Sequence, residues 1–142
     1  MITSFRGEYR FLSNFYPTKF LFQGFEWSTA EHAYQAMKKV DLEYWKKLLD
    51  PSVTAADAKR LGREVDIDSS FHRNRIHYMR MIVNAKFGSN PELMKMLRET
   101  APHELVEGNT WGDTFWGQCP IGNGRNELGK ILMTIRDSVF YD

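Results

Sequence analysis

Residues 28–38 read Ser-Thr-Ala-Glu-His-Ala-Tyr-Gln-Ala-Met-Lys, and this stretch indicates a helix. Apolar side chains recur in and beyond it at the three- and four-residue spacing of one helix face, namely Ala30, Ala33, Tyr34, Met37 and Trp45. Asp50-Pro51 is a typical stop signal. We therefore predict a helix that begins at Ser28 and is closed by Asp50-Pro51.

The residues that precede this helix are aromatic and have the short period of strands. We expect strands at 9–12, 20–22 and 25–27, with a tight turn at Gln23-Gly24 between the last two. Ser, Asn and Pro favour turns, so residues 13–17 are predicted to form a loop that carries two aromatic rings.

Helical spacing returns in the rest of the chain. Further helices are predicted at 55–61, at 70–87, from Asn90-Pro91 onward and at 127–140. Thr54 is a candidate cap, while Gly62 and Gly88 are placed to end the helices before them. Residues 104–107 are expected to be extended.

The composition describes an ordinary globular protein. The chain has 142 residues, 42% of them hydrophobic, and 19 Lys+Arg against 18 Asp+Glu, so no gross attraction to a polyanion follows. Cys119 is the only cysteine, which excludes an intramolecular disulfide and a Cys-rich zinc site. No secretory signal or membrane span is evident, and no histidine pair has metal-ligand spacing on a helix. We expect a cytosolic protein of one domain, without metal or cofactor.

A first group of candidate functional residues lies on the predicted helix at 28–50. Glu31, Gln35 and Lys38 follow the i, i+4, i+7 spacing, so a carboxylate, an amide and an amine share one face. The alternative for Glu31 is a capping box with Ser28, and for Lys38 a solvated helix face.

A second group lies in residues 108–126, which are rich in Gly, Trp and Asn and lack a helical period. Long loops in a compact domain are often functional. Asp113 stands between Trp111 and Trp116-Gly117, where rings could stack on a heterocycle and desolvate the carboxylate. The alternative is a surface loop whose tryptophans plug into the core.

Two features could recognise phosphate. Gly124-Arg125-Asn126 precedes the last helix and offers backbone amides, a helix start and a guanidinium. The helix at 70–87 carries basic residues and has no acid between Asp68 and Glu92, namely His72, Arg73, Arg75, His77, Arg80 and Lys86. That stretch could face a nucleic acid or a phosphorylated ligand, and its alternative is a solvated face.

Taken together, these segments resemble the NADAR (YbiA-like) family over nearly the whole chain. The similar pieces, in chain order, are Arg10-Phe11-Leu12-Ser13-Asn14-Phe15, Glu31-His32-Ala33-Tyr34-Gln35-Ala36 with Lys38, Leu61-Gly62-Arg63, Lys86-Phe87, Leu105-Val106-Glu107, Asp113 with Trp116-Gly117, and Gly124 to Arg136. One departure is Phe71-His72, where the family pattern has a tryptophan.

The resemblance implies a single compact α+β domain over residues 1–142, mainly helical, with a small N-terminal β element. It implies an N-glycosidase acting on phosphorylated N-ribosides, either phosphoribosylamino-pyrimidine intermediates of riboflavin synthesis or ADP-ribosyl-guanine in DNA. It raises Glu31, Lys38 and Asp113 as catalytic candidates. The residues it implies in substrate binding are Asn14, Phe15, Gln35, Trp111, Trp116, Gly117, Gly124, Arg125 and Asn126.

Three questions of mechanism and function remain open from the sequence. In an enzyme, Glu31 could activate water directly, or the Lys38 amine could capture ribose C1 as an imine. The pocket could belong to a non-catalytic module that binds ADP-ribose or NAD. The aromatic loops could instead meet a protein partner.

Overall fold

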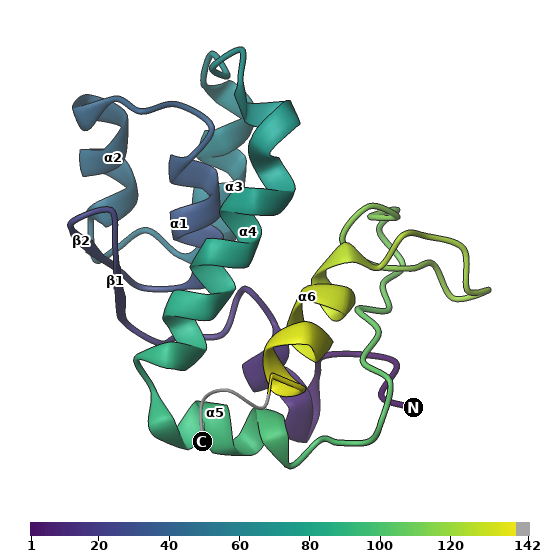
Figure 1. Cartoon of the computed structure of the whole chain (residues 1–142). Coiled ribbons are helices and arrows are strands. Elements are labelled where there is room, and N and C mark those ends of the chain that lie inside the picture. The colour runs from purple at the N-terminus through teal and green to yellow at the C-terminus, as the bar shows by residue number, and fades with distance from the viewer. Residues whose placement is uncertain (139–142) are drawn as a thin grey trace. The chain divides into compact units, whose positions relative to one another are not determined.

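The computed structural model describes residues 1–138 and divides the chain into two units (Figure 1). One unit comprises residues 14–89, and the other comprises residues 1–13 together with the part from Asn90 onward. The regular structure of the described residues consists of a two-stranded sheet, six α-helices and one 3-10 helix. The predicted α+β class, mainly helical with a small N-terminal β element, is confirmed.

The unit of residues 14–89 begins with the predicted hairpin. Strands β1 (Phe20–Phe22) and β2 (Phe25–Trp27) pair antiparallel. Gln23 and Gly24 have φ of 54° and 80°, the left-handed conformations that a tight two-residue hairpin turn requires. The Trp27 indole donates to the Phe22 carbonyl at 2.8 Å, which ties the core tryptophan to its own hairpin.

The segment predicted as one helix from Ser28 to Asp50 is two helices, α1 (Ala30–Ala36) and α2 (Leu42–Leu49). The prediction was wrong because Asp41 caps α2, where its carboxylate accepts from the Tyr44 amide at 3.0 Å. The linker is held from outside, since Asp68 accepts from the Val40 amide through its side chain.

The start of α1 also differs from the prediction. Thr29 is the N-cap, and its hydroxyl accepts from the His32 amide at 3.1 Å. The capping box considered for Ser28 and Glu31 is therefore wrong, because the helix begins one residue later than that arrangement requires.

Helices α3 (Ala55–Glu64) and α4 (Phe71–Gly88) complete this unit, and α1 packs against α2, α3 and α4 (Figure 1). Thr54 caps α3 as predicted, in a capping box with Asp57. Gly62, however, lies inside α3 rather than ending it. Helix α4 matches its predicted bounds closely.

The other unit contains the 3-10 helix η1 (Gly7–Leu12) and helices α5 (Pro91–Arg98) and α6 (Glu127–Arg136). The predicted strand at 9–12 is wrong, because a short apolar run does not distinguish a strand from a helical turn. The expected extension at 104–107 is seen at Leu105, which forms a parallel bridge with Ile2. Helix α6 ends at Arg136, with Asp137 as its C-cap, so the predicted continuation of this helix to residue 140 is wrong. Residues 139 and 140 themselves lie outside the described residues.

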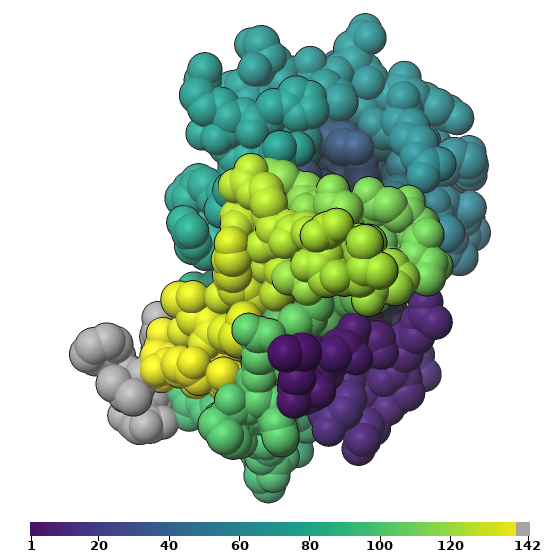
Figure 2. Space-filling model, turned by 90° about the vertical axis from the view of Figure 1, so that its right-hand side faces the viewer, coloured from purple at the N-terminus to yellow at the C-terminus, as the bar shows by residue number. Residues whose placement is uncertain are grey.

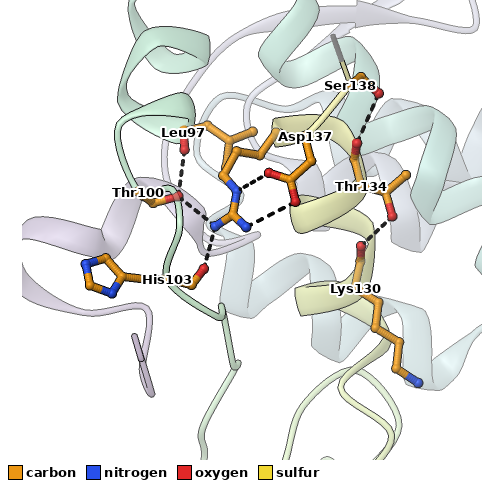
Figure 3. A network of polar contacts seen from close by, with 8 residues as sticks. Leu97, Thr100, His103, Lys130, Thr134, Asp137 and Ser138 are labelled. Carbon is orange, nitrogen blue, oxygen red and sulfur yellow. Dashed lines mark hydrogen bonds and ion pairs between the residues drawn. The ribbon is translucent and has the colours of Figure 1, made fainter.

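A buried arginine fastens α6 to the segment after α5 (Figure 3). Arg136 donates to the Thr100 hydroxyl at 3.3 Å and to the His103 carbonyl at 2.5 Å. Its Nε and Nη2 bind the Asp137 carboxylate. Of the helices in residues 1–138, none is long and apolar enough to cross a membrane.

Candidate active site

Helix α1 buries a carboxylate and an amide side by side. Glu31 and Gln35 are 8% and 3% exposed, and Gln35 Nε2 donates to Glu31 Oε2 at 2.5 Å. The i, i+4 spacing thus brings the two side chains together as the sequence predicts. Gln35 Oε1 is buried and has no hydrogen-bond partner among the described residues. A carboxylate taken out of water and oriented by the Gln35 amide is suited to stabilise positive charge.

Lys38 lies just after α1 and is half-buried. Burial lowers the pKa of its amine, the Glu31 carboxylate opposes that shift, and the cations Arg63 and Lys59 add to it. Its Nζ would lie 3.3 Å from a Cβ built on Gly62, so the amine sits against that part of α3. A lowered pKa increases the fraction of neutral, nucleophilic amine.

Gly62 explains how α3 approaches this pair so closely. A Cβ at this position would lie 1.8 Å from Gln35 Oε1 and 2.8 Å from Gln35 Cδ. No side chain fits there, so the glycine serves close packing of α1 and α3 rather than a left-handed helix end.

Neighbouring residues fix the backbone and one face of α1. The Tyr44 hydroxyl donates to the Gln35 carbonyl at 2.7 Å, and burial raises its pKa, with a further contribution from Glu31. The Val53 carbonyl can only accept, so His32 Nε2 donates to it at 2.8 Å. In the neutral ring of the buried His32, Nδ1 then accepts from the Thr29 hydroxyl at 2.7 Å. Desolvation lowers the pKa of His32, which fits a neutral ring.

The predicted loop at residues 13–17 reaches the start of α1. The Glu31 amide donates to the Asn14 carbonyl at 3.0 Å, and Asn14 Nδ2 lies 3.5 Å from Met79 Sδ. Phe15 is 42% exposed. Asn14 therefore holds Glu31 through the main chain, whereas the Phe15 ring is partly exposed at the surface.

Asp113 organises the loop of residues 108–126 in the other unit. Its Oδ1 accepts from the amides of Phe115 and Trp116 at 3.1 and 2.9 Å. Its own amide donates to Asn109 Oδ1, and Asn109 Nδ2 donates back to the Asp113 carbonyl. The carboxylate thus closes a local turn, the usual use of an Asp at a loop start.

The aromatic residues of this loop differ in exposure. Trp111 is 56% exposed, and Figure 2 shows that residues 108–126, green to yellow-green, lie at the surface. Trp116 is half-buried and meets Phe115 edge to face, with ring centroids 4.7 Å apart. Gly117 is buried, and a Cβ there would lie 2.0 Å from the Glu107 carbonyl oxygen. Gly117 therefore serves packing.

The start of α6 does not offer open amides. The amides of Arg125, Asn126, Glu127 and Leu128 donate to the carbonyls of residues 114, 117, 115 and 116 at 2.7–3.2 Å. The premise that these amides are available to a phosphate is wrong, because the preceding loop already satisfies them.

The three residues predicted there also have structural contacts. Asn126 uses its side chain internally, with Oδ1 accepting from the Glu107 amide and Nδ2 donating to the Leu105 carbonyl. Gly124, at φ 145°, would place a Cβ 2.3 Å from the Gly117 carbonyl oxygen. Arg125 remains largely exposed, above the Phe115 ring and 3.6 Å from Glu127.

The basic stretch of α4 is not one face. Lys86 is only 1% exposed, and burial lowers its pKa to about 7. Its Nζ lies 5.8 Å from the Tyr16 ring centroid and 5.1 Å from that of Phe87. Lys86 therefore belongs to the interior, whereas Arg73 and Arg80 are exposed.

Two cations near Lys38 were missed as candidates from the sequence. Lys59 and Arg63 lie on α3, on either side of Gly62, and both influence the pKa of Lys38. The segment Leu61-Gly62-Arg63 was visible as a family-like piece, but the glycine was interpreted as a helix end. Within residues 1–138, no group of three or more His, Cys, Asp or Glu is arranged to hold a metal ion.

The chain belongs to the NADAR domain family, whose model matches residues 4–139. It is 34% identical over 134 residues to the N-glycosidase YbiA of Escherichia coli, covering 93% of this chain and 82% of the relative. It is 40% identical over 131 residues to a riboflavin biosynthesis protein of Vibrio vulnificus. This match covers 91% of this chain but only 35% of the length of that relative. The NMR structure of Escherichia coli YbiA superposes with a TM-score of 0.83 at 33% identity, covering 96% of this chain and 81% of that one.

Proposed function

We propose that this protein hydrolyses the bond between ribose C1 and nitrogen in a phosphorylated N-riboside, with a phosphoribosylamino-pyrimidine as its small-molecule substrate. The enzyme class follows from the relatives: a protein 34% identical over 93% of the chain is named an N-glycosidase, and this chain is a hydrolase acting on N-glycosyl bonds. The name of the Vibrio vulnificus relative, a riboflavin biosynthesis protein, supports the pyrimidine substrate.

The observation that carries the proposal is the buried Glu31 carboxylate fixed by Gln35 at 2.5 Å. Cleavage of a ribose C1–N bond builds positive charge on the sugar ring. A carboxylate held in a partly dry site stabilises that charge and can take a proton from the attacking water. Gln35 keeps the acceptor oriented without neutralising it.

Lys38 supports a second route to the same products. The neutral Nζ would attack C1 while the C1–N bond breaks, and the electron pair of that bond goes to the leaving nitrogen, which takes up the proton that the amine gives up. The sugar ring of the resulting glycosylamine then opens: the bond from C1 to the ring oxygen breaks, the second amine proton moves to that oxygen, and C1 and Nζ form the imine. Water adds to the imine and releases the sugar, which regenerates the amine. Burial of Lys38 favours this route, while the charge of Glu31 opposes it by holding the proton on the amine.

Trp111 and Trp116 keep proposed roles in substrate recognition, whereas Asp113, a catalytic candidate from the resemblance, is proposed to position this loop. The exposed Trp111 ring suits stacking on a planar base. Asp113 would act as a positioning residue, because its carboxylate holds the turn that carries Trp116. Variants of this loop are therefore expected to change the substrate KM more than kcat.

The test compares Glu31→Gln with Glu26→Gln, a matched change of an exposed glutamate in β2. Each variant is incubated with a phosphoribosylamino-pyrimidine and, separately, with DNA carrying ADP-ribosyl-guanine. The released pyrimidine is measured in the first case and the released ADP-ribose in the second. We expect Glu31→Gln to lose about a hundredfold or more in kcat on the pyrimidine while still binding it, and Glu26→Gln to match the parent protein. Unchanged turnover by Glu31→Gln would contradict its role.

The same assay separates the alternatives. Release of free ADP-ribose from the modified DNA without pyrimidine release would overturn the substrate proposed here. Binding of ADP-ribose with no turnover of either substrate would identify a non-catalytic module. Borohydride added during turnover should attach sugar to Lys38 only if the imine route operates, and Lys38→Arg should then be inactive.

A further inference from the structure

A group of cations lies on one side of the Glu31–Gln35 pair. Helix positions 59, 62 and 63 share a face of α3 because they are three and four residues apart. Gly62, in the middle of that face, meets Gln35, and its Cβ position is 3.3 Å from Lys38 Nζ. Lys59 and Arg63 therefore flank the point where Lys38 reaches α3.

These cations are not neutralised by neighbouring acids. Arg60, the remaining basic residue of this part of α3, pairs with Asp57 at 3.3 Å and with Glu64 at 3.9 Å. Neither Lys59 nor Arg63 has a carboxylate within 4.0 Å among the described residues. The charges of Lys59 and Arg63 both act on the Lys38 amine, which also interacts with the Glu31 carboxylate.

The buried acceptor Gln35 Oε1 is a second, independent sign that this place is incomplete. It is directed at Gly62 and has no donor within residues 1–138. A buried polar atom without a partner costs free energy and calls for an explanation in native proteins. A hydroxyl group of a bound sugar would supply the missing donor.

We infer that Lys59 and Arg63 form the subsite for the phosphate of the substrate, at the face of α3 beside Lys38 rather than at the start of α6. The inference rests on the proposed function, because it takes the ligand to be a sugar phosphate whose C1 faces Glu31. A phosphate on the sugar 5-carbon is one ring width away from C1, which places it on the neighbouring helix face. Arg63 offers a planar fork for two phosphate oxygens, and Lys59 adds a point charge.

The test measures binding of ribose 5-phosphate and of unphosphorylated ribose by calorimetry, so that it does not depend on turnover. Lys59→Met and Arg63→Met are compared with Arg60→Met, a matched change on the same helix. We expect each of the first two to weaken ribose 5-phosphate binding by about tenfold or more, Arg63→Lys to restore part of it, and Arg60→Met to bind like the parent protein. Binding of ribose should be the same in all variants.

Equal binding of ribose 5-phosphate by the parent protein and by both Met variants would overturn the subsite, as would no binding by the parent protein. Phosphate-dependent binding that needs Lys59 and Arg63, without hydrolysis of any N-riboside, would leave the subsite intact and refute only the proposed function. Hydrolysis that both Met variants perform equally on phosphorylated and unphosphorylated substrates would refute only the subsite.

Discussion

Replacing Gly62 by alanine probes the contact on which the candidate active site depends. The new Cβ would lie 1.8 Å from Gln35 Oε1, so Gln35 has to move by more than an ångström to reach an ordinary contact distance. Overpacking of this kind costs about 1–3 kcal/mol. Movement of Gln35 also breaks its hydrogen bond to Glu31, and displacement of a catalytic group by about 1 Å costs on the order of a hundredfold in rate.

Gly88→Ala is the matched control, because a Cβ on Gly88 meets no atom within 4 Å at the end of α4. Both substitutions gain helix propensity, up to about 1 kcal/mol, so the difference between the two variants isolates the packing cost at Gly62. In urea unfolding, the free energy of unfolding of Gly62→Ala should be about 1–3 kcal/mol lower than that of Gly88→Ala. Only Gly62→Ala should lose turnover. If the two variants are equally stable and equally active, the close approach of α1 and α3 is not what orients Gln35.

Three further predictions concern buried charged or titratable groups. Burial lowers the pKa of Lys86 to about 7, so between pH 7 and the ordinary pKa of a lysine the unfolded chain binds more protons than the folded one. The free energy of unfolding should therefore rise by about 2 kcal/mol from pH 7 to pH 9. Urea titrations of Lys86→Met should show no such rise. The lowered pKa of His32 makes the free energy of unfolding depend on pH in the same direction, but at lower pH. The free energy of unfolding should fall as the pH drops below about 6.5, by at most about 1.4 kcal/mol per pH unit. His32→Gln should flatten this slope. Arg136→Met removes the donors to Thr100 and His103 and should cost about 1–3 kcal/mol in thermal unfolding, whereas a methionine at the exposed Lys130 should be neutral.

Local signals predicted those elements whose causes are local. The hairpin follows from Gln23-Gly24, where both residues adopt positive φ, and α3 begins at the predicted Thr54 because its capping box is formed by adjacent residues. The pairing of Glu31 with Gln35 follows from helical spacing alone, and the structure has the two in contact.

The sequence failed where a distant partner decides the structure. The apolar stripe from Ala30 to Trp45 stays in helical phase across the break between α1 and α2, so its period cannot reveal that Asp68 holds the linker at Val40. The packing of Gly62 on Gln35 joins two helices and leaves no mark in either segment. For the same reason the sequence did not indicate Lys59 or Arg63 as candidate site residues.

The loop of residues 114–117 accepts four main-chain hydrogen bonds from the start of α6 through its carbonyl oxygens. Main-chain bonds do not depend on the side chain that each residue carries, so this anchorage survives exchange of Thr114, Phe115 or Trp116. Gly117 alone has no room for a substituent. The loop can therefore present new side chains to a ligand while the helix behind it stays in place, which makes residues 114–116 the natural positions at which to diversify recognition in a library without losing the fold.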